Sequence, residues 1–169
     1  TPSTTYTPTP QPLKILCLHG GGGSASGLRS ALLPLQSALG SNIYFVYASA
    51  PHSSGVWYLD PPNGKNNPTT DPNWASQSFS VLDNIVSTQG PFDGILGYSQ
   101  GSAMSYLYLS ANPNSFRFIV TFCGFLPTTH IGLNTRITTA SFAIPSLFYY
   151  GTNDNIISNI QTTTAATHF

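Results

Sequence analysis

The segment best suited to chemistry is Gly97-Tyr98-Ser99-Gln100-Gly101, which follows a short apolar run and precedes residues that can form a helix. This layout is typical of a sharp strand-to-helix turn that presents a serine hydroxyl as a nucleophile. The glycines two residues either side of Ser99 allow neighbouring backbone to pack closely around a strained residue. The following helix would point unpaired N–H groups at a developing oxyanion. We therefore predict that Ser99 is a nucleophile, the alternative being a surface serine in an ordinary turn.

A second glycine-rich segment, His19-Gly20-Gly21-Gly22-Gly23-Ser24, directly follows the apolar run 13–18. Consecutive glycines indicate backbone that approaches another group closely or adopts positive φ. A phosphate-binding loop is the rival interpretation, but the Gly-Lys-Ser/Thr ending of a P-loop and a proper dinucleotide fingerprint are both missing. We predict instead an oxyanion-hole loop, in which the N–H of Gln100 and that of Gly21 or Gly22 bind the oxyanion.

A serine nucleophile needs a base, and the base needs a carboxylate to orient it. In triads built on this kind of turn the chain order is Ser, then Asp or Glu, then His. After Ser99 the only acidic residue is Asp154, and the only histidine in the required order is His168. Asp154 ends a predicted strand, and its alternative role is to cap the next helix. If residues 158–169 were helical, the helix would carry His168 roughly 18 Å away along its axis, whereas an extended end could fold back to Ser99.

Hydrophobic patterns predict the elements that position these residues. The predicted strands are 13–18, 42–48, 92–97, 116–122 and 145–154, and the predicted helices are 28–39, 74–88, one after Ser99, and 156–169, while 127–144 is expected to be loop. Pro34 would kink or shorten the first helix. Strands that alternate with helices predict an α/β domain over 13–169, with a parallel sheet, helices on both faces and ligands at the carboxyl ends of its strands. Residues 1–12 are Thr/Pro-rich and are expected to form an extended arm.

Residues 53–73 form a long predicted loop that is rich in Gly, Pro, Asn and Asp. Loops of this length in compact domains tend to be functional. The loop leaves the predicted ligand-binding edge after His52 and carries Trp57 and Tyr58. We predict that His52, Trp57 and Tyr58 bind substrate at the cavity entrance; the alternative is that the two aromatic residues only pin the loop to the domain.

Five motifs together resemble one known family. They are Leu16-Cys-Leu-His-Gly20, Ala50-Pro-His52, Gly90-Pro-Phe-Asp-Gly-Ile-Leu-Gly-Tyr-Ser-Gln-Gly101, Phe122-Cys-Gly-Phe125, and Ile144-Pro-Ser-Leu with Gly151-Thr-Asn-Asp154. Through them, most of 13–169 resembles the FSH serine hydrolase family of the α/β hydrolases, which includes fungal esterases and polyketide-releasing thioesterases. The resemblance implies an α/β-hydrolase fold with a minimal cap, Ser99 as nucleophile and Asp154 as triad acid.

The same resemblance raises a question about the base. The family's histidine lies in a Gly-Gly-His-Phe-like motif that comes after one more helix and strand. His168-Phe169 matches the last two residues of that motif, but 156–169 aligns better with the helix that precedes it. We therefore expect the chain to stop before its base rather than to use His168.

Three functions follow as hypotheses. The first is a serine hydrolase that cleaves small-molecule carboxylic esters or thioesters through an acyl-enzyme, without a cofactor or metal. The second is a non-catalytic α/β-hydrolase domain that lacks its histidine. The third is a peptidase on the same fold.

Composition limits the possible partners. Five basic and five acidic residues give zero net charge, and only 6% of residues are charged, against about 25% in typical domains. The chain therefore offers no basic surface for nucleic acid or anionic membranes. No apolar run approaches the length of about 18 residues that a membrane span needs, and the lack of a secretory segment favours a cytoplasmic location, with a removed leader as the alternative. Cys17 and Cys123 lie in apolar runs and are expected to be free thiols.

Overall fold

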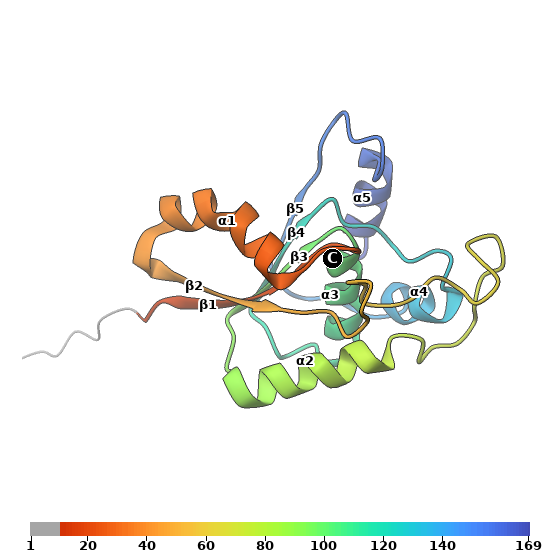
Figure 1. Cartoon of the computed structure of the whole chain (residues 1–169), viewed down its shortest axis with the longest axis horizontal. Helices are drawn as coiled ribbons and strands as arrows, with labels where there is room; N and C mark the ends of the chain where they lie inside the picture. The colour runs from red at the N-terminus through yellow and green to blue at the C-terminus, as the bar shows by residue number, and fades with distance from the viewer. Residues whose placement is uncertain (1–10) are drawn as a thin grey trace, which may run out of the picture.

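The computed structural model describes residues 11–169, which form a five-stranded parallel sheet with helices on both faces (Figure 1). The strand order is β2-β1-β3-β4-β5. The strands are β1 (Leu13–Leu18), β2 (Ile43–Ala48), β3 (Gly94–Tyr98), β4 (Phe118–Phe122) and β5 (Ser146–Tyr149). The helices are α1 (Ala25–Leu39), the 3-10 helix η1 (Gly40–Asn42), α2 (Ser76–Gln89), α3 (Gln100–Ala111), α4 (Ile131–Thr138) and α5 (Asn159–Ala166). The predicted α/β class is confirmed; the predicted arm falls almost entirely outside the described residues.

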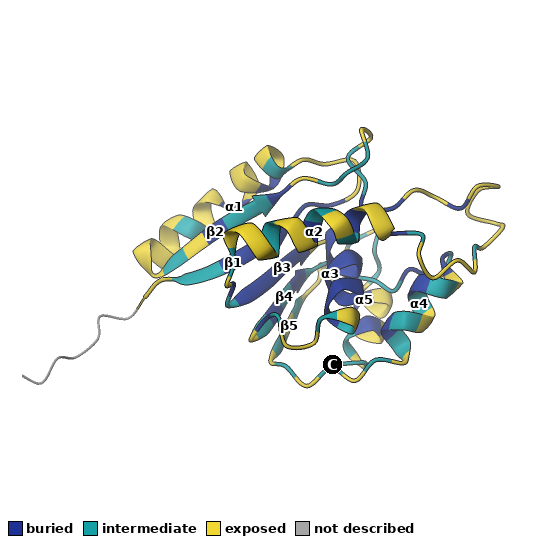
Figure 2. Ribbon diagram, turned by 90° about the horizontal axis from the view of Figure 1, so that it is seen from below, coloured by how far each residue is buried: buried dark blue, intermediate teal, exposed yellow. Residues whose placement is uncertain are grey.

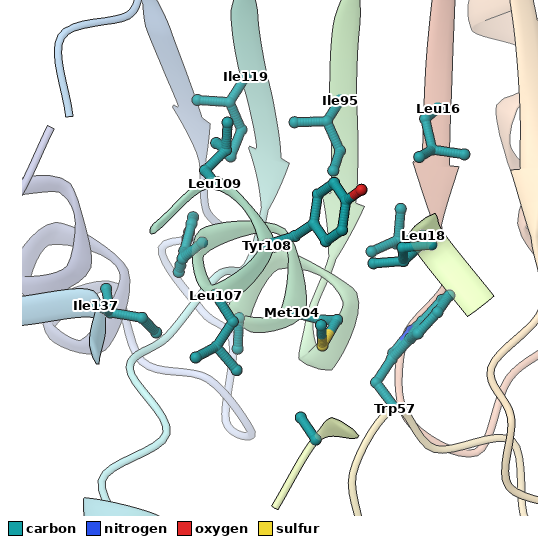
Figure 3. Close-up of a cluster of buried hydrophobic side chains, with 14 of the residues drawn as sticks. Leu16, Leu18, Trp57, Ile95, Met104, Leu107, Tyr108, Leu109, Ile119 and Ile137 are labelled. Carbon is teal, nitrogen blue, oxygen red and sulfur yellow. The ribbon is translucent and has the colours of Figure 1, made fainter. Parts of the chain in front are cut away.

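The sheet separates two hydrophobic cores, because successive side chains of a strand point to opposite faces. On one face, alternate residues of three adjacent strands, Leu16, Ile95 and Ile119, pack with the buried side chains of α3 (Figure 3). On the other face, Ile15 and Cys17 pack with the buried leucines of α1. The central strands are therefore covered on both sides, which explains why their sequences are continuously apolar.

The central helix of the fold is α3, in which every residue from 101 to 109 is buried (Figure 2). Its buried serines are satisfied by backbone carbonyls: Ser105 Oγ donates to Gly101 O (2.8 Å) and Ser102 Oγ donates to Phe122 O (3.3 Å). A buried helix with paired polar groups is a rigid element. The residue at its N-terminus, Ser99, is thus fixed by the core of the protein.

Two local predictions were wrong or incomplete. Residues 127–144 contain α4, although they were expected to be loop. Threonine and glycine lower helix propensity, but Leu133 and Ile137, one turn apart, are fully buried in the core, and this packing stabilises the helix. Pro34 lies inside α1, which nevertheless continues to Leu39.

Asp93 joins the beginning of β3 to both neighbouring strands. Its Oδ2 accepts a hydrogen bond from the Lys14 N–H (2.9 Å) and its Oδ1 accepts one from Arg117 Nη1 (3.0 Å). The Lys14 N–H, and then the Arg117 guanidinium, hold the pKa of Asp93 below its ordinary value. The ionised carboxylate therefore stabilises the folded state.

Asp93→Asn is expected to lower the free energy of unfolding at neutral pH by about 1–3 kcal/mol, because hydrogen bonds to a charged group are lost. A carboxyl whose pKa is lowered on folding contributes this stability above its unfolded-state pKa of about 3.9 and loses it as the pH falls further. Urea denaturation of both proteins at about pH 7 and pH 3 should therefore show a smaller difference at the lower pH. An equal difference at the two pH values would contradict this role.

Candidate active site

Ser99 lies in the turn between the end of β3 and the beginning of α3. Its φ of 51° and ψ of −119° are a combination that L-residues rarely adopt. Its N–H donates to Phe122 O (2.9 Å), and its carbonyl accepts from the Ser102 N–H (2.9 Å). The backbone of Ser99 is thus held from both β4 and α3, and the half-buried residue lines a cavity.

The two glycines of the turn are required by close backbone approach. A Cβ at Gly101 would lie 2.3 Å from Leu18 O and 2.5 Å from His19 O. A Cβ at Gly97 would lie 2.5 Å from Ser102 Cα. Real Cβ atoms essentially never come this close to another heavy atom. The prediction that backbone packs tightly around Ser99 is confirmed.

The cavity beside Ser99 has a volume of about 800 Å³, within the range of about 300–1,000 Å³ that is usual for small-molecule sites. Its walls come from the 53–73 loop, the segment 125–130 after β4, and residues 156–161 at the beginning of α5. The apolar part of the wall consists of Val56, Leu59, Pro61, Pro62, Phe125, Leu126, Pro127, Ile156 and Ile157. The cavity therefore suits a substrate with an apolar part next to the serine.

Two backbone N–H groups of the cavity wall are candidates for binding an oxyanion. Gln100 is the first residue of α3, so its N–H has no acceptor within the helix. Gly21 also lines the cavity. The N–H of Gly22 instead donates to Gly55 O (2.8 Å). Of the two predicted alternatives, Gly22 has its N–H taken up by the long loop, which leaves Gly21; Gly21 and Gln100 remain predictions.

Trp57 anchors the long loop to the core and is not among the residues that line the cavity. Its side chain is fully buried, and its indole N–H donates to His19 O (2.7 Å). Its backbone N–H donates to Gln100 Oε1 (2.9 Å), and its carbonyl accepts from the Ser78 hydroxyl. Of the two roles predicted for Trp57, the structure favours pinning of the loop over contact with substrate. Tyr58 is also buried but lines the cavity, so its contact with substrate remains a prediction.

His130 lines the same cavity as Ser99, but both of its ring nitrogens are occupied. Nε2 lies 2.8 Å from Leu59 O, and since a carbonyl only accepts, Nε2 carries the proton. Nδ1 then accepts from the Thr129 hydroxyl (3.0 Å). Burial lowers the pKa of His130, which favours this neutral form. Leu59 O also accepts from the Trp74 indole N–H (2.8 Å), so His130 and Trp74 together hold the loop.

The remaining histidines do not meet Ser99 either. His19 is buried, and both of its ring nitrogens are hydrogen-bonded to backbone groups. His52 is half-buried and lies outside the set of residues that line the cavity. Within residues 11–169, no histidine ring forms a hydrogen bond with the side chain of Ser99 or Asp154. The structure therefore does not assemble the triad expected from the chain order.

The end of the chain shows why His168 is not with Ser99. Residues 159–166 form α5, and the next residue after His168, Phe169, stacks on Phe142 with ring centroids 4.1 Å apart. Phe169 also packs against Tyr106 of α3 at 5.2 Å. The extended return that would bring His168 to Ser99 is therefore not formed, and His168 is not a cavity-lining residue.

Asp154 lies in the turn after β5, where its Oδ1 accepts from the N–H groups of Ile156 (2.8 Å) and Ile157 (2.9 Å). These bonds, Ile157 first, and the Cys123 thiol lower the pKa of Asp154. An ionised carboxylate is suited to orienting an imidazole, but the bonds observed are those of a turn aspartate. The cap of α5 is Ser158. Both cysteines are free, as predicted, although Cys123 is only half-buried.

Charged groups are sparse around the cavity. The exposed pair Asp60 and Lys65, 3.9 Å apart, lies in its wall. Among residues 11–169, no group of three or more His, Cys, Asp or Glu side chains is arranged to hold a metal ion. No helix in this range combines the length and the apolar character needed to cross a membrane.

The parallel sheet and the serine turn between β3 and α3 define the α/β-hydrolase fold of esterases, and solved structures agree. Esterase PE8 superposes with a TM-score of 0.69 at 21% identity, covering 94% of this chain and 76% of that protein. Acyl-protein thioesterase 2 of Zea mays gives a TM-score of 0.68 at 20% identity, covering 95% and 79%.

The particular family follows from sequence comparison. The model of the serine hydrolase (FSH1) family matches residues 8–74 and 55–169, so the chain belongs to this family. Esterase alnB of Emericella nidulans is 33% identical over 134 residues, which cover 72% of this chain and 47% of alnB. Human esterase OVCA2 is 30% identical over 195 residues, which cover 94% of this chain and 84% of OVCA2. The chain thus spans about half the length of alnB. Family, relatives and fold together support a hydrolase of esters or thioesters.

Proposed function

We propose that this protein hydrolyses small-molecule carboxylic esters or thioesters through an acyl-enzyme on Ser99. The observation that carries the proposal is the positive φ of Ser99 at the rigid N-terminus of α3, beside an apolar cavity. A serine is held in this strained conformation only because the surrounding backbone enforces it. Membership in a serine hydrolase family supports the same conclusion.

In the first half of the reaction, Ser99 Oγ bonds to the substrate's carbonyl carbon while the carbonyl electron pair moves to the oxygen. The N–H groups of Gln100 and Gly21 bind the resulting oxyanion, and losing one such donor typically costs about 2.7–4 kcal/mol of transition-state stabilisation. Collapse of this intermediate breaks the bond to the alcohol or thiol, which leaves with the proton that Ser99 Oγ gave up. Water then adds to the acyl carbon, the bond from that carbon to Ser99 Oγ breaks, and the acid is released while a proton from the water returns to the serine.

Proton transfer to and from Ser99 is the step for which the described residues supply no histidine. Within residues 11–169 no histidine ring is hydrogen-bonded to Ser99 or Asp154, which favours a non-catalytic domain as the second candidate. Oxyanion donors and binding alone can still accelerate hydrolysis about 10³–10⁴-fold over water when triad members are removed. We therefore expect slow turnover rather than none.

The test is to treat the protein with a fluorophosphonate probe and to locate the adduct by mass spectrometry. A single adduct on Ser99 supports the acyl-enzyme. A folded protein that acquires no adduct supports the non-catalytic alternative.

His168→Ala is expected to leave the slow hydrolysis of p-nitrophenyl esters and its pH profile unchanged, because His168 lies away from the cavity lining. Thr163→Ala, a change of an exposed residue on α5, controls for damage to that helix. If His168 were the base, the variant would lose activity by orders of magnitude.

A further inference from the structure

The chemistry proposed above uses only the backbone N–H of Gln100. The side chain of Gln100 nevertheless forms a hydrogen bond through each of its two polar atoms. Its Oε1 accepts from the Trp57 N–H (2.9 Å), and its Nε2 donates to Tyr58 O (2.9 Å). The carboxamide thus binds one donor and one acceptor of the loop backbone in a fixed order. An amide supplies a donor and an acceptor side by side on one planar group, whereas an ionised carboxylate only accepts.

The bonded loop segment forms part of the cavity wall. Val56, Tyr58 and Leu59 line the cavity, and Trp57 between them is packed in the same core cluster as Leu18 and Met104 (Figure 3). The position of these wall residues relative to Ser99 therefore depends on the bonds that hold the backbone of Trp57 and Tyr58.

The same carboxamide also supports the second candidate oxyanion donor. A Cβ at Gly21 would lie 3.1 Å from Gln100 Oε1, 3.4 Å from its Cδ and 3.5 Å from its Cβ. The Gln100 side chain therefore occupies the space beside Gly21 into which a Cβ would project. One residue thus contacts the loop that walls the cavity and the glycine segment opposite α3.

We propose that Gln100 is a positioning residue: its side chain sets the cavity wall at 56–59 relative to the oxyanion donors, and so determines how well an extended acyl chain is accepted. This inference rests on the proposed function. It adds a specificity role to a residue whose backbone already serves the reaction.

Replacing Gln100 with glutamate gives a variant whose hydrogen-bond donor is lost or regained when the pH is changed. Ionised Gln100→Glu still accepts from Trp57 but cannot donate to Tyr58, and it places a negative charge against that carbonyl. Once protonated, the carboxyl regains an O–H donor and an acceptor. Gln100→Met removes both groups at similar volume, and Gln77→Glu places the same charge at an exposed position of α2 as a control.

The experiment measures Ser99 labelling rates for a decyl and a methyl fluorophosphonate at about pH 7.5 and about pH 4.5, and amide exchange at Trp57, corrected for intrinsic rates. The ratio of the two labelling rates cancels changes in the nucleophile itself. We expect Gln100→Glu to lower the decyl-to-methyl ratio at the higher pH, with partial recovery at the lower pH, where part of the carboxyl is protonated. Trp57 exchange should stay near the native rate in this variant, because the carboxylate still accepts that N–H. Gln100→Met should lower the ratio and speed Trp57 exchange about tenfold at both pH values, and the native protein and Gln77→Glu should show neither change.

An unchanged ratio in both Gln100 variants would overturn the proposal, whether or not exchange at Trp57 accelerates. If Gln100→Met does not fold, the comparison of Gln100→Glu with itself at two pH values decides the matter. If the native protein is not labelled at Ser99, the proposed function is overturned, and so is the proposed effect of Gln100 on the acceptance of an acyl chain. Exchange at Trp57 then still shows whether Gln100 holds the loop, so the two failures are distinguishable.

Discussion

Ser99→Gly is expected to lose all labelling by a fluorophosphonate probe and, at the same time, to stabilise the protein. The φ of Ser99 is 51°, and an L-residue held in such a conformation costs about 1–3 kcal/mol. Glycine relieves this strain but adds freedom to the unfolded chain, so we expect a net rise of about 1 kcal/mol in the free energy of unfolding. Ser99→Ala keeps the strain and should lose labelling without the gain. Mass spectrometry and urea denaturation measure the two effects.

Ser80→Ala, at an exposed position of α2, should change neither quantity. An adduct that persists in Ser99→Gly, or that maps to Ser24 or Ser102, would refute the assignment of the nucleophile. A loss of labelling together with a rise in the free energy of unfolding, both at one position, is a result that a serine in an ordinary turn would not produce.

Gly101→Ala is expected to be the most damaging single methyl addition near the site. The new Cβ would lie 2.3 Å from Leu18 O and 2.5 Å from His19 O, so α3 would have to move away from the end of β1. Overpacking of this kind lowers the free energy of unfolding by about 3 kcal/mol. Displacing Ser99 by about 1 Å would also slow labelling about 100-fold.

Gly27→Ala is the matched control, because a Cβ there meets only the Oγ of Ser24, the N-cap of α1, at 3.3 Å. It should change the free energy of unfolding by no more than about 1 kcal/mol, the size of a glycine-to-alanine effect in a helix. Equal stability of Gly101→Ala and the native protein would show that α3 and β1 are less tightly packed than described.

Much of the fold could be predicted from the sequence because its signals are local. The apolar runs at 13–18 and 94–98 become β1 and β3, the strands buried on both faces. Helix α4 was missed because its threonines and glycine oppose helix formation, while the burial of Leu133 and Ile137 depends on distant elements. The spacing of those two residues was the one available signal.

The site residues also fall into those that a local segment predicts and those whose roles depend on distant segments. Ser99 and its glycines were predictable because one short segment encodes the turn. The roles of Gly22 and Trp57 were not, since each depends on a partner far along the chain: Gly55 takes the Gly22 donor, and Gln100 and Ser78 hold the Trp57 backbone. Hydrogen bonds between distant segments have no counterpart in residue spacing.

The long loop is held mainly through its backbone, and this affects how the cavity wall can be altered. Side chains from outside residues 53–73 bond the Trp57 N–H and the carbonyls of Trp57, Tyr58 and Leu59. Backbone bonds at Gly55 and Thr69 and the indole bond of Trp57 add to them. A substitution of Val56 or Leu59 changes the chemistry of the wall but deletes none of these bonds. A single substitution at either position can therefore alter the wall at little cost in stability, whereas the path of the loop depends on the residues around it.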